Sequence, residues 1–450
     1  MIRMSVYVNR ILNLKNMKVI GFDMDHTLVR YHSEIFEELA FKVVLDKLVK
    51  LKNYPEEILD FEFDYTKVVR GLVFDKVRGN VLKLSRYSEV KMGIHGLNPL
   101  TYDMIRKIYK GLHIDLTQNQ YYSLDTNFSI STGLIFSLLV NLKDNSPAEC
   151  FPKGYTYFDI FTDIDTMINL SHMDGSLKEV VKNDLTKYVI KDEEIVDMLQ
   201  VFKKEGKILM IITNSDYDYT RVLLDYCINP YLAEGQSWQD IFDYVITNSE
   251  KPRFFTEKSK FLKVDRETGL MSNWTLPLQK GIYQGGCAME FQKQLHLKGS
   301  QILYLGDHIY GDIVTLKKSC DWKTGLVVDE LSAESLAIQK SNKIQKKLDK
   351  LMAEKEALEL ELEALEGEEY NAFFKKIIEL DETIYQNIIK FKSFFNPIWG
   401  PIMRAGIEDS RLANQIERFA CIYMSKISNL KDYSPKHYFR PKRRLLPHEL

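Results

Sequence analysis

The chain has 450 residues, of which 45% are hydrophobic and 28% are charged. The length indicates more than one domain. The composition is typical of a globular protein and excludes a wholly disordered chain. Sixty-one basic residues nearly cancel 63 acidic ones, which argues against a dedicated nucleic-acid binder, because such proteins carry a clear basic excess.

Four short apolar segments predict buried strands, and amphipathic helices are predicted over residues 33–51 and 192–204. In chain order the strands cover residues 18–23, 206–213, 300–306 and 323–329. Continuously apolar strands that alternate with helices indicate a parallel sheet covered on both faces. We therefore expect an α/β fold of the Rossmann type.

The first two strands are too far apart in the chain for a single crossover helix. Residues 70–84 have the pattern of a β-hairpin, and the aromatic-rich stretch that follows has a mostly helical pattern. We interpret this stretch as an inserted, mainly helical cap domain. The expected organisation is a core in two parts, residues 1–87 and 189–333, a cap over residues 88–188, and a helical extension over residues 334–450 that packs on the core.

The extension begins with a long helix rich in Lys, Glu and Leu. Its apolar residues between Ile344 and Leu365 are spaced by threes, fours and sevens, which is a heptad stripe. We favour packing onto a neighbouring helix of the same chain over an intermolecular coiled coil.

Carboxylates follow the first strand directly. Asp23 and Asp25 are two residues apart, so an extended backbone would place both side chains on one side. One of them can act as a nucleophile and the other as a general acid and base. The alternative interpretation is an acidic turn or a helix cap.

Polar residues also follow the later strands. Thr213, Asn214 and Ser215 stand at a strand-to-helix turn, where free N–H groups bind phosphate oxygens well. By itself this could be an ordinary helix cap, and the later loop lysine, Lys251, could be a surface residue. Two aspartates flanked by glycines, Asp307 and Asp312, follow the third strand and are typical of a hard-cation site.

Together, and in this order, these segments resemble the four-motif signature of the haloacid dehalogenase (HAD) superfamily. The resemblance extends to the cytosolic purine 5′-nucleotidase family that prefers IMP and GMP, and it covers over nine-tenths of the chain. The segments that carry it are residues 21–28, 70–75, 174–179, 213–217, 251–255, 281–286, 306–312 and 446–449.

The resemblance implies a magnesium-dependent 5′-nucleotidase. Asp23 would attack the phosphorus and Asp25 would serve as acid and then as base. Mg²⁺ would be bound by Asp23, the Asp25 carbonyl and Asp307, with Asp312 in support. The residues implied to hold the phosphoryl oxygens are Thr213, Asn214, Ser215 and Lys251.

The resemblance also implies nucleoside contacts on the cap. Phe128 fits the position of a stacking aromatic, His172 that of a cap histidine, and Lys178 that of a residue reaching the base. Where the family has an arginine and, four residues later, an aspartate, this chain has Asp165 and Asn169. This difference changes the polarity offered to the base.

The family resemblance further implies a homo-oligomer and regulation by a nucleotide effector. Tyr310 and Lys318 fit positions of the effector site, whereas Asp125 stands where the family has an asparagine. The scattered cysteines and the lack of a leader or membrane segment favour a cytoplasmic protein that binds neither nucleic acid nor membrane. A phosphotransferase, or a phosphatase of another phosphomonoester, would use the same residues. A non-enzymatic scaffold is disfavoured because all the acidic pairs are present.

Overall fold

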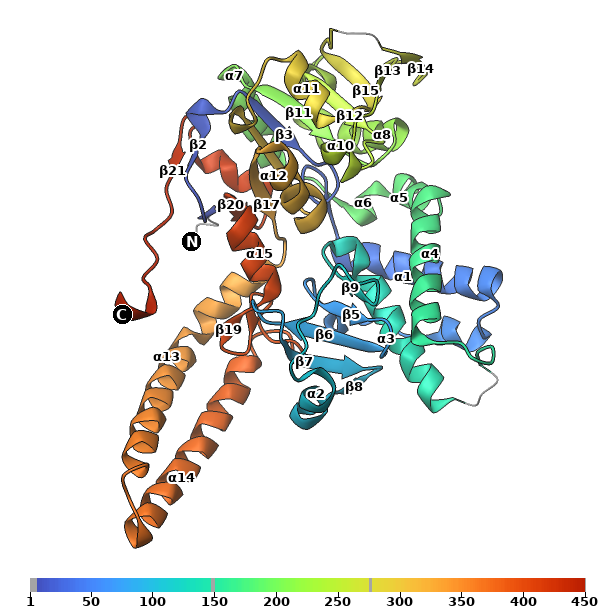
Figure 1. Ribbon diagram of the computed structural model, residues 1–450. Coiled ribbons are helices and arrows are strands. Elements are labelled where there is room, and N and C mark those ends of the chain that lie inside the picture. The colour runs from blue at the N-terminus through green and yellow to red at the C-terminus, as the bar shows by residue number, and fades with distance from the viewer. Residues whose placement is uncertain (1–5, 147–149, 275–276, 450) are drawn as a thin grey trace.

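A ten-stranded, mainly parallel sheet forms the centre of the molecule in the computed structural model, which describes residues 6–146, 150–274 and 277–449 (Figure 1). The strand order is β1-β20-β17-β16-β3-β11-β12-β15-β13-β14, and only β1, β13 and β14 run antiparallel to their neighbours. The parallel strands are β3 (Val19–Phe22), β11 (Ile208–Ile212), β12 (Tyr244–Thr247), β15 (Gly281–Gly285), β16 (Ile302–Gly306), β17 (Lys323–Val327) and β20 (Ile422–Met424). The strands in antiparallel pairs are β1 (Tyr7–Val8) at one edge of the sheet and β13 (Phe261–Val264) and β14 (Met271–Asn273) toward the other.

Alternate residues of the central strand pack on opposite faces of the sheet. In β3, Ile20 and Phe22 join one hydrophobic cluster with α7 (Glu193–Lys204) and α8 (Tyr217–Cys227). Val19 joins a second cluster on the other face, formed with α10 (Arg253–Thr256), α11 (Ala288–Gln294) and α12 (Thr315–Cys320). Burial on both faces explains why the strand segments are continuously apolar, and the mainly parallel α/β sheet is as predicted.

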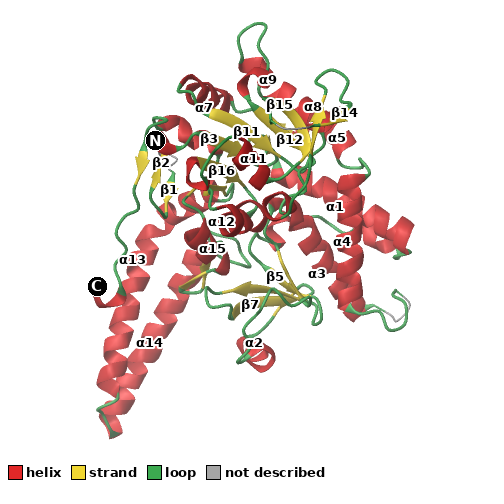
Figure 2. Ribbon diagram, turned by 45° about the horizontal axis from the view of Figure 1, so that its top comes forward, coloured by secondary structure: helices red, strands yellow, loops and turns green. Residues whose placement is uncertain are grey.

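A second body lies beside the sheet and has its own core (Figure 2). It consists of a five-stranded antiparallel sheet, in the order β8-β7-β6-β5-β9, against which helices pack. The strands are β5 (Val73–Asp75), β6 (Asn80–Leu84), β7 (Val90–His95), β8 (Asn98–Pro99) and β9 (Tyr121–Ser123), and the helices are α1 (Ser33–Lys52), α2 (Tyr102–Tyr109), α3 (Ile130–Asn145) and α4 (Tyr157–Met173).

This arrangement differs from the expected cap in two ways. The hairpin β5–β6 pairs with β7 and β9, so the cap sheet begins at Val73, ahead of residue 88. Helix α1, expected in the core, packs against α3 and α4. Sheet pairing and helix packing join residues that are distant in sequence, which a local pattern does not reveal.

The C-terminal segment is a helical hairpin followed by a return to the core sheet. Helices α13 (Leu331–Leu362) and α14 (Gly367–Lys392) pack on each other and project from the body. The heptad helix therefore packs within the chain, as favoured, and Leu348 is buried there together with Ile377 and Ile384. The segment also contributes α15 (Arg411–Phe419) and β20, so it is not purely helical.

Small elements complete the chain. Three two-stranded pairs join β2 (Leu12–Asn13) to β21 (Tyr438–Phe439), β4 (Arg30–Tyr31) to β10 (Val189–Ile190), and β18 (Arg404–Ala405) to β19 (Glu408–Asp409). Short helices are α5 (Lys178–Asn183), α6 (Leu185–Tyr188) and α9 (Trp238–Ile241). Within the residues that the structure describes, no helix is both long enough and apolar enough to cross a lipid bilayer.

Candidate active site

The predicted site residues come together at the carboxyl ends of adjacent strands. Strand β3 lies between β16 and β11, and β12 follows next in the sheet. Asp23 and Asp25 follow β3, Thr213 follows β11 and Asp307 follows β16, while Lys251 lies in the loop after β12. Because parallel strands end at one edge of the sheet, four distant segments of the chain reach one place.

Three buried carboxylates form the centre of this site. Asp23, Asp307 and Asp312 each offer an oxygen, and these oxygens all lie within 4.8 Å of one another. Asp312 is held in place by the N–H of His308, which donates to its Oδ2 at 3.2 Å. The close approach of Asp312 to the strand end depends on Gly306, because a Cβ at that position would lie 2.7 Å from the Asp312 Cβ.

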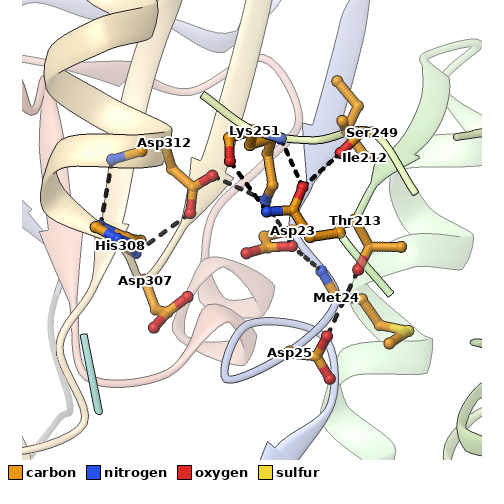
Figure 3. A network of polar contacts seen from close by, with 12 residues as sticks. Asp23, Met24, Asp25, Ile212, Thr213, Ser249, Lys251, Asp307, His308 and Asp312 are labelled. Carbon is orange, nitrogen blue, oxygen red and sulfur yellow. Dashed lines mark hydrogen bonds and ion pairs between the residues drawn. The ribbon is translucent and has the colours of Figure 1, made fainter. Parts of the chain in front are cut away.

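Lys251 supplies the positive charge beside two of these carboxylates (Figure 3). Its Nζ lies 2.8 Å from Asp23 Oδ1 and 2.8 Å from Asp312 Oδ1, and it donates to the Tyr304 hydroxyl at 3.1 Å. Tyr304 in turn donates to the Ile212 carbonyl. The lysine side chain is only 5% exposed. Burial by itself would lower its pKa and favour the neutral amine. Asp23 and Asp312 outweigh that effect, so the pKa of Lys251 is well above its usual range and the ammonium is retained.

Asp25 points away from the three-carboxylate centre into a group of hydroxyls. Tyr31 donates to Asp25 Oδ1 at 2.6 Å, and Ser215 donates to Oδ2 at 2.9 Å. Thr213 reaches the same oxygen at 3.5 Å. Burial raises the pKa of Asp25, and the hydroxyl bonds partly offset this effect. A raised pKa lets a carboxyl hold its proton to a higher pH than usual, which suits a proton donor.

The phosphate-binding residues predicted after β11 have protein partners. The Asn214 side chain accepts from the Lys251 N–H at 2.6 Å and donates to the Lys251 carbonyl at 3.1 Å. It also accepts from the Ser249 hydroxyl at 3.0 Å. Asn214 thus ties the β11 turn to the loop that carries Lys251, and the Ser215 hydroxyl is directed to Asp25.

The centre has the donor set of a divalent-cation site. Three carboxylates face one ammonium group, and burial raises the pKa of Asp307 to about 8 and that of Asp23 well above its usual range. Carboxylate oxygens are hard ligands of the kind that Mg²⁺ prefers, and a dication would compensate their excess negative charge. The residues therefore fit a bound divalent metal ion.

The cap residues lie on the side of the site beyond Asp25. The Phe128 ring packs against His26 at 4.3 Å and against His172 at 5.6 Å between centroids. Lys178 pairs with Asp216 at 2.6 Å, and Asn169 is exposed on α4. Burial lowers the pKa of His172 to about 4, so its imidazole is neutral at pH 7.

Several residues of the site carry no local signal in the sequence. Tyr31 and Tyr304 bind Asp25 and Lys251 directly, but a tyrosine next to or inside an apolar segment looks like core. Arg70 donates to the Asp307 carbonyl at 3.1 Å and pairs with Glu330 at 2.6 Å. The residues 70–75 carried part of the family resemblance, which was the available signal for Arg70.

Comparison with known proteins identifies the family of this chain. The chain matches the 5′ nucleotidase family over residues 6–450. It is 28% identical to a 5′-nucleotidase domain-containing protein of Dictyostelium discoideum over 99% of this chain and 75% of that protein. It is also 28% identical to 5′-nucleotidase domain-containing protein 2 of Rattus norvegicus, over 99% and 80% respectively. A HAD phosphatase structure from Thermococcus onnurineus aligns with 14% identity and a TM-score of 0.28, over 70% of this chain and 87% of that one. The chain belongs to the 5′ nucleotidase family and is a phosphomonoester hydrolase.

Proposed function

We propose that the protein hydrolyses purine nucleoside 5′-monophosphates of the IMP and GMP kind to the nucleoside and inorganic phosphate, through an aspartyl-phosphate on Asp23. The observation that supports this most strongly is the Lys251 ammonium between Asp23 and Asp312, with Asp307 beside them. An anionic nucleophile can approach an anionic phosphate only where cationic groups offset their repulsion.

In the first step the Asp23 carboxylate forms a bond to phosphorus and the bond from phosphorus to the 5′-oxygen breaks. Asp25 donates its proton to that oxygen, and the nucleoside leaves as the alcohol. The raised pKa of Asp25 suits this role, since the carboxyl must be protonated before the step. Hydrogen bonds from Tyr31 and Ser215 fix the orientation of this carboxyl.

In the second step a water molecule attacks the phosphorus and the bond between phosphorus and Asp23 breaks. The Asp25 carboxylate takes the proton of that water, so both residues return to their starting states. Lys251 contributes positive charge to the phosphoryl oxygens in both steps, together with the Thr213 hydroxyl and the turn that contains Asn214 and Ser215.

The metal ion in this proposal is Mg²⁺, held by Asp23, the Asp25 main-chain carbonyl and Asp307, with Asp312 supporting the site. When bound, Mg²⁺ withdraws negative charge from the phosphoryl group. The fit of the three carboxylates to a divalent ion supports this assignment.

The nucleoside would bind against the cap. Phe128 offers an aromatic face for stacking, neutral His172 lies next to it, and Lys178 lies at the start of α5. Asn169 completes the proposed binding set from α4. A nucleotide effector and a homo-oligomer remain part of the proposal, as does a cytoplasmic location.

A phosphate-release screen tests the substrate. IMP and GMP are compared with pyrimidine nucleotides and sugar phosphates, with Mg²⁺ and with excess chelator. We expect release to be fastest from the purine nucleotides and to stop without the metal ion. Faster release from sugar phosphates would overturn the substrate assignment. Labelled inosine added as an acceptor reports phosphate transfer in place of hydrolysis.

The Asp23→Asn variant tests the covalent step. We expect turnover to fall by at least about three orders of magnitude, because the amide is not a nucleophile, while the circular dichroism spectrum stays that of the wild type. The matched control is Asp243→Asn. Asp243 is also buried, but it precedes β12 at the opposite edge of the sheet and pairs with Lys203 and Lys280. Unchanged turnover in Asp23→Asn would exclude Asp23 as the nucleophile.

A further inference from the structure

The projecting hairpin carries a stripe of large apolar side chains on the outer surface of α14. These side chains are 40–57% exposed, although their hairpin neighbours Ile377 and Ile384 are buried against α13. At about 100° per residue, all of them fall within roughly a quarter to a third of the helix circumference. The stripe consists of Tyr370, Phe374, Ile378, Tyr385 and Ile389.

The spacing of the stripe is symmetric along the helix. Tyr370 and Phe374 precede the midpoint between Glu379 and Leu380 by the same intervals by which Ile389 and Tyr385 follow it. A second α14 placed antiparallel about this midpoint would bring Tyr370 opposite Ile389 and Phe374 opposite Tyr385. Each apolar residue near the ends of the stripe would thus meet an apolar residue of the other copy. Near the midpoint, Ile378 would lie opposite Asp381, whose carboxylate pairs with Lys355 of its own chain.

Charges beside the stripe follow the same symmetry. Lys375 and Glu382 lie on the same flank of the stripe and on opposite sides of the midpoint. In the antiparallel pair, Lys375 of each copy would lie about 3 Å along the axis from the level of Glu382 of the other copy, within reach of a lysine side chain. Glu382 is held on its own helix by Gln386, which donates to it at 2.9 Å.

We propose that the α14 stripe is an interface between two copies of this chain, which pair their hairpins antiparallel about a two-fold axis near Glu379. Such an interface is self-complementary, as a two-fold axis requires. Two helices of 26 residues give a contact up to about 39 Å long. Phe374 and Tyr385, on either side of its centre, are aromatic side chains of the type that is enriched in protein interfaces. The interface is independent of the catalytic chemistry, since the stripe lies on the projecting hairpin (Figures 1 and 2).

Analytical ultracentrifugation of the full chain over micromolar concentrations tests the interface. We expect Phe374→Ser combined with Tyr385→Ser to halve the molecular mass of the assembly. Lys375→Glu and Glu382→Lys should each weaken association by at least about tenfold, because each places like charges opposite one another. The double variant K375E/E382K should restore association, which only antiparallel self-pairing predicts.

The matched control is Lys376→Glu, which makes the same charge change on the side of α14 away from the stripe and should leave association unchanged. Phosphate release by every variant reports that the fold is intact. A wild-type chain that is monomeric throughout, or an assembly unaffected by the serine variants, would overturn the proposal and leave the stripe to a different partner. If K375E/E382K weakened association as much as either single variant does, the antiparallel register would be excluded.

Discussion

Two aspartates that are two positions apart have opposite environments in this protein. Asp23 lies against the Lys251 ammonium and two further carboxylates, whereas Asp25 lies among the hydroxyls of Tyr31, Ser215 and Thr213. The Lys251 ammonium favours the anion of Asp23, although burial and the neighbouring carboxylates raise the pKa of this group. The pKa of Asp25 is raised by burial, and the surrounding hydroxyls partly offset that effect while they orient the carboxyl. The assignment of nucleophile and acid therefore depends on neighbours from other strands.

A third buried carboxyl, Glu37, affects stability and takes no part in the proposed chemistry. It is fully buried on α1, where one oxygen accepts from the Ser131 N–H at 2.6 Å. Burial raises the pKa of Glu37 from 4.5 to about 8. The folded protein therefore binds this proton more tightly than the unfolded chain does, and stability falls as the pH rises between about 4.5 and 8, by up to about 1.4 kcal/mol per pH unit.

The Glu37→Gln variant should remove this dependence, because the amide stays neutral and can still accept from Ser131. We expect the melting temperature of the variant, relative to that of the wild type, to increase as the pH is raised from 5 to above 8. Thermal unfolding across this range measures the difference. A constant difference at all pH values would show that Glu37 ionises in the folded protein with its ordinary pKa.

At the level of secondary structure, the site depends on how strands end. Strand β16 ends at Gly306, and the helical turn that follows brings Asp312 back over the strand end. The lack of a side chain at Gly306 lets the carboxylate of Asp312 lie beside Asp23 and Lys251. The backbone conformation at position 306 is one that other residues also adopt. Glycine is therefore required here because of the close approach of Asp312, not because of its backbone freedom.

The Gly306→Ala variant should therefore displace Asp312. Its Cβ would lie 2.7 Å from the Asp312 Cβ and Cγ, and a displacement near 1 Å can lower turnover about a hundredfold. Gly93→Ala is the control, because its Cβ would be similarly close to Leu100, 2.9 Å away, in the cap sheet. We expect both variants to lose some stability and only Gly306→Ala to lose turnover. Equal turnover in the two variants would contradict this role of Gly306.

At the level of the whole molecule, one buried arginine joins three parts of the chain. Arg70 lies just before the cap strand β5, donates to the carbonyl of Asp307 after β16, and pairs with Glu330 ahead of α13. Its side chain is 1% exposed. Since a buried guanidinium needs partners for its charge, this residue holds the cap, the site and the hairpin in one arrangement.

The Arg70→Ala variant should lower the free energy of unfolding by about 3 kcal/mol, because it leaves Glu330 without its partner. It should also raise the Mg²⁺ concentration needed for half-maximal phosphate release, since the Asp307 loop loses its anchor. The double variant R70M/E330Q separates the two effects. We expect it to recover stability in chemical denaturation and to keep the altered Mg²⁺ response. A wild-type Mg²⁺ response in both variants would restrict Arg70 to a structural role.

The sequence by itself determined the parallel core and the chemistry of the strand ends. Continuous apolar strands and the acidic pairs that follow them are local patterns, from which the sheet and the residues Asp23, Asp25, Asp307 and Asp312 were predicted. Lys251 has no such local pattern, and only the family resemblance predicted its role. The tertiary structure decided which side chains meet: Tyr31 and Tyr304 at the site, Arg70 behind it, α1 in the cap and β20 in the core sheet. These contacts join residues far apart along the chain, and their energies come from burial and pairing, which no local spacing encodes.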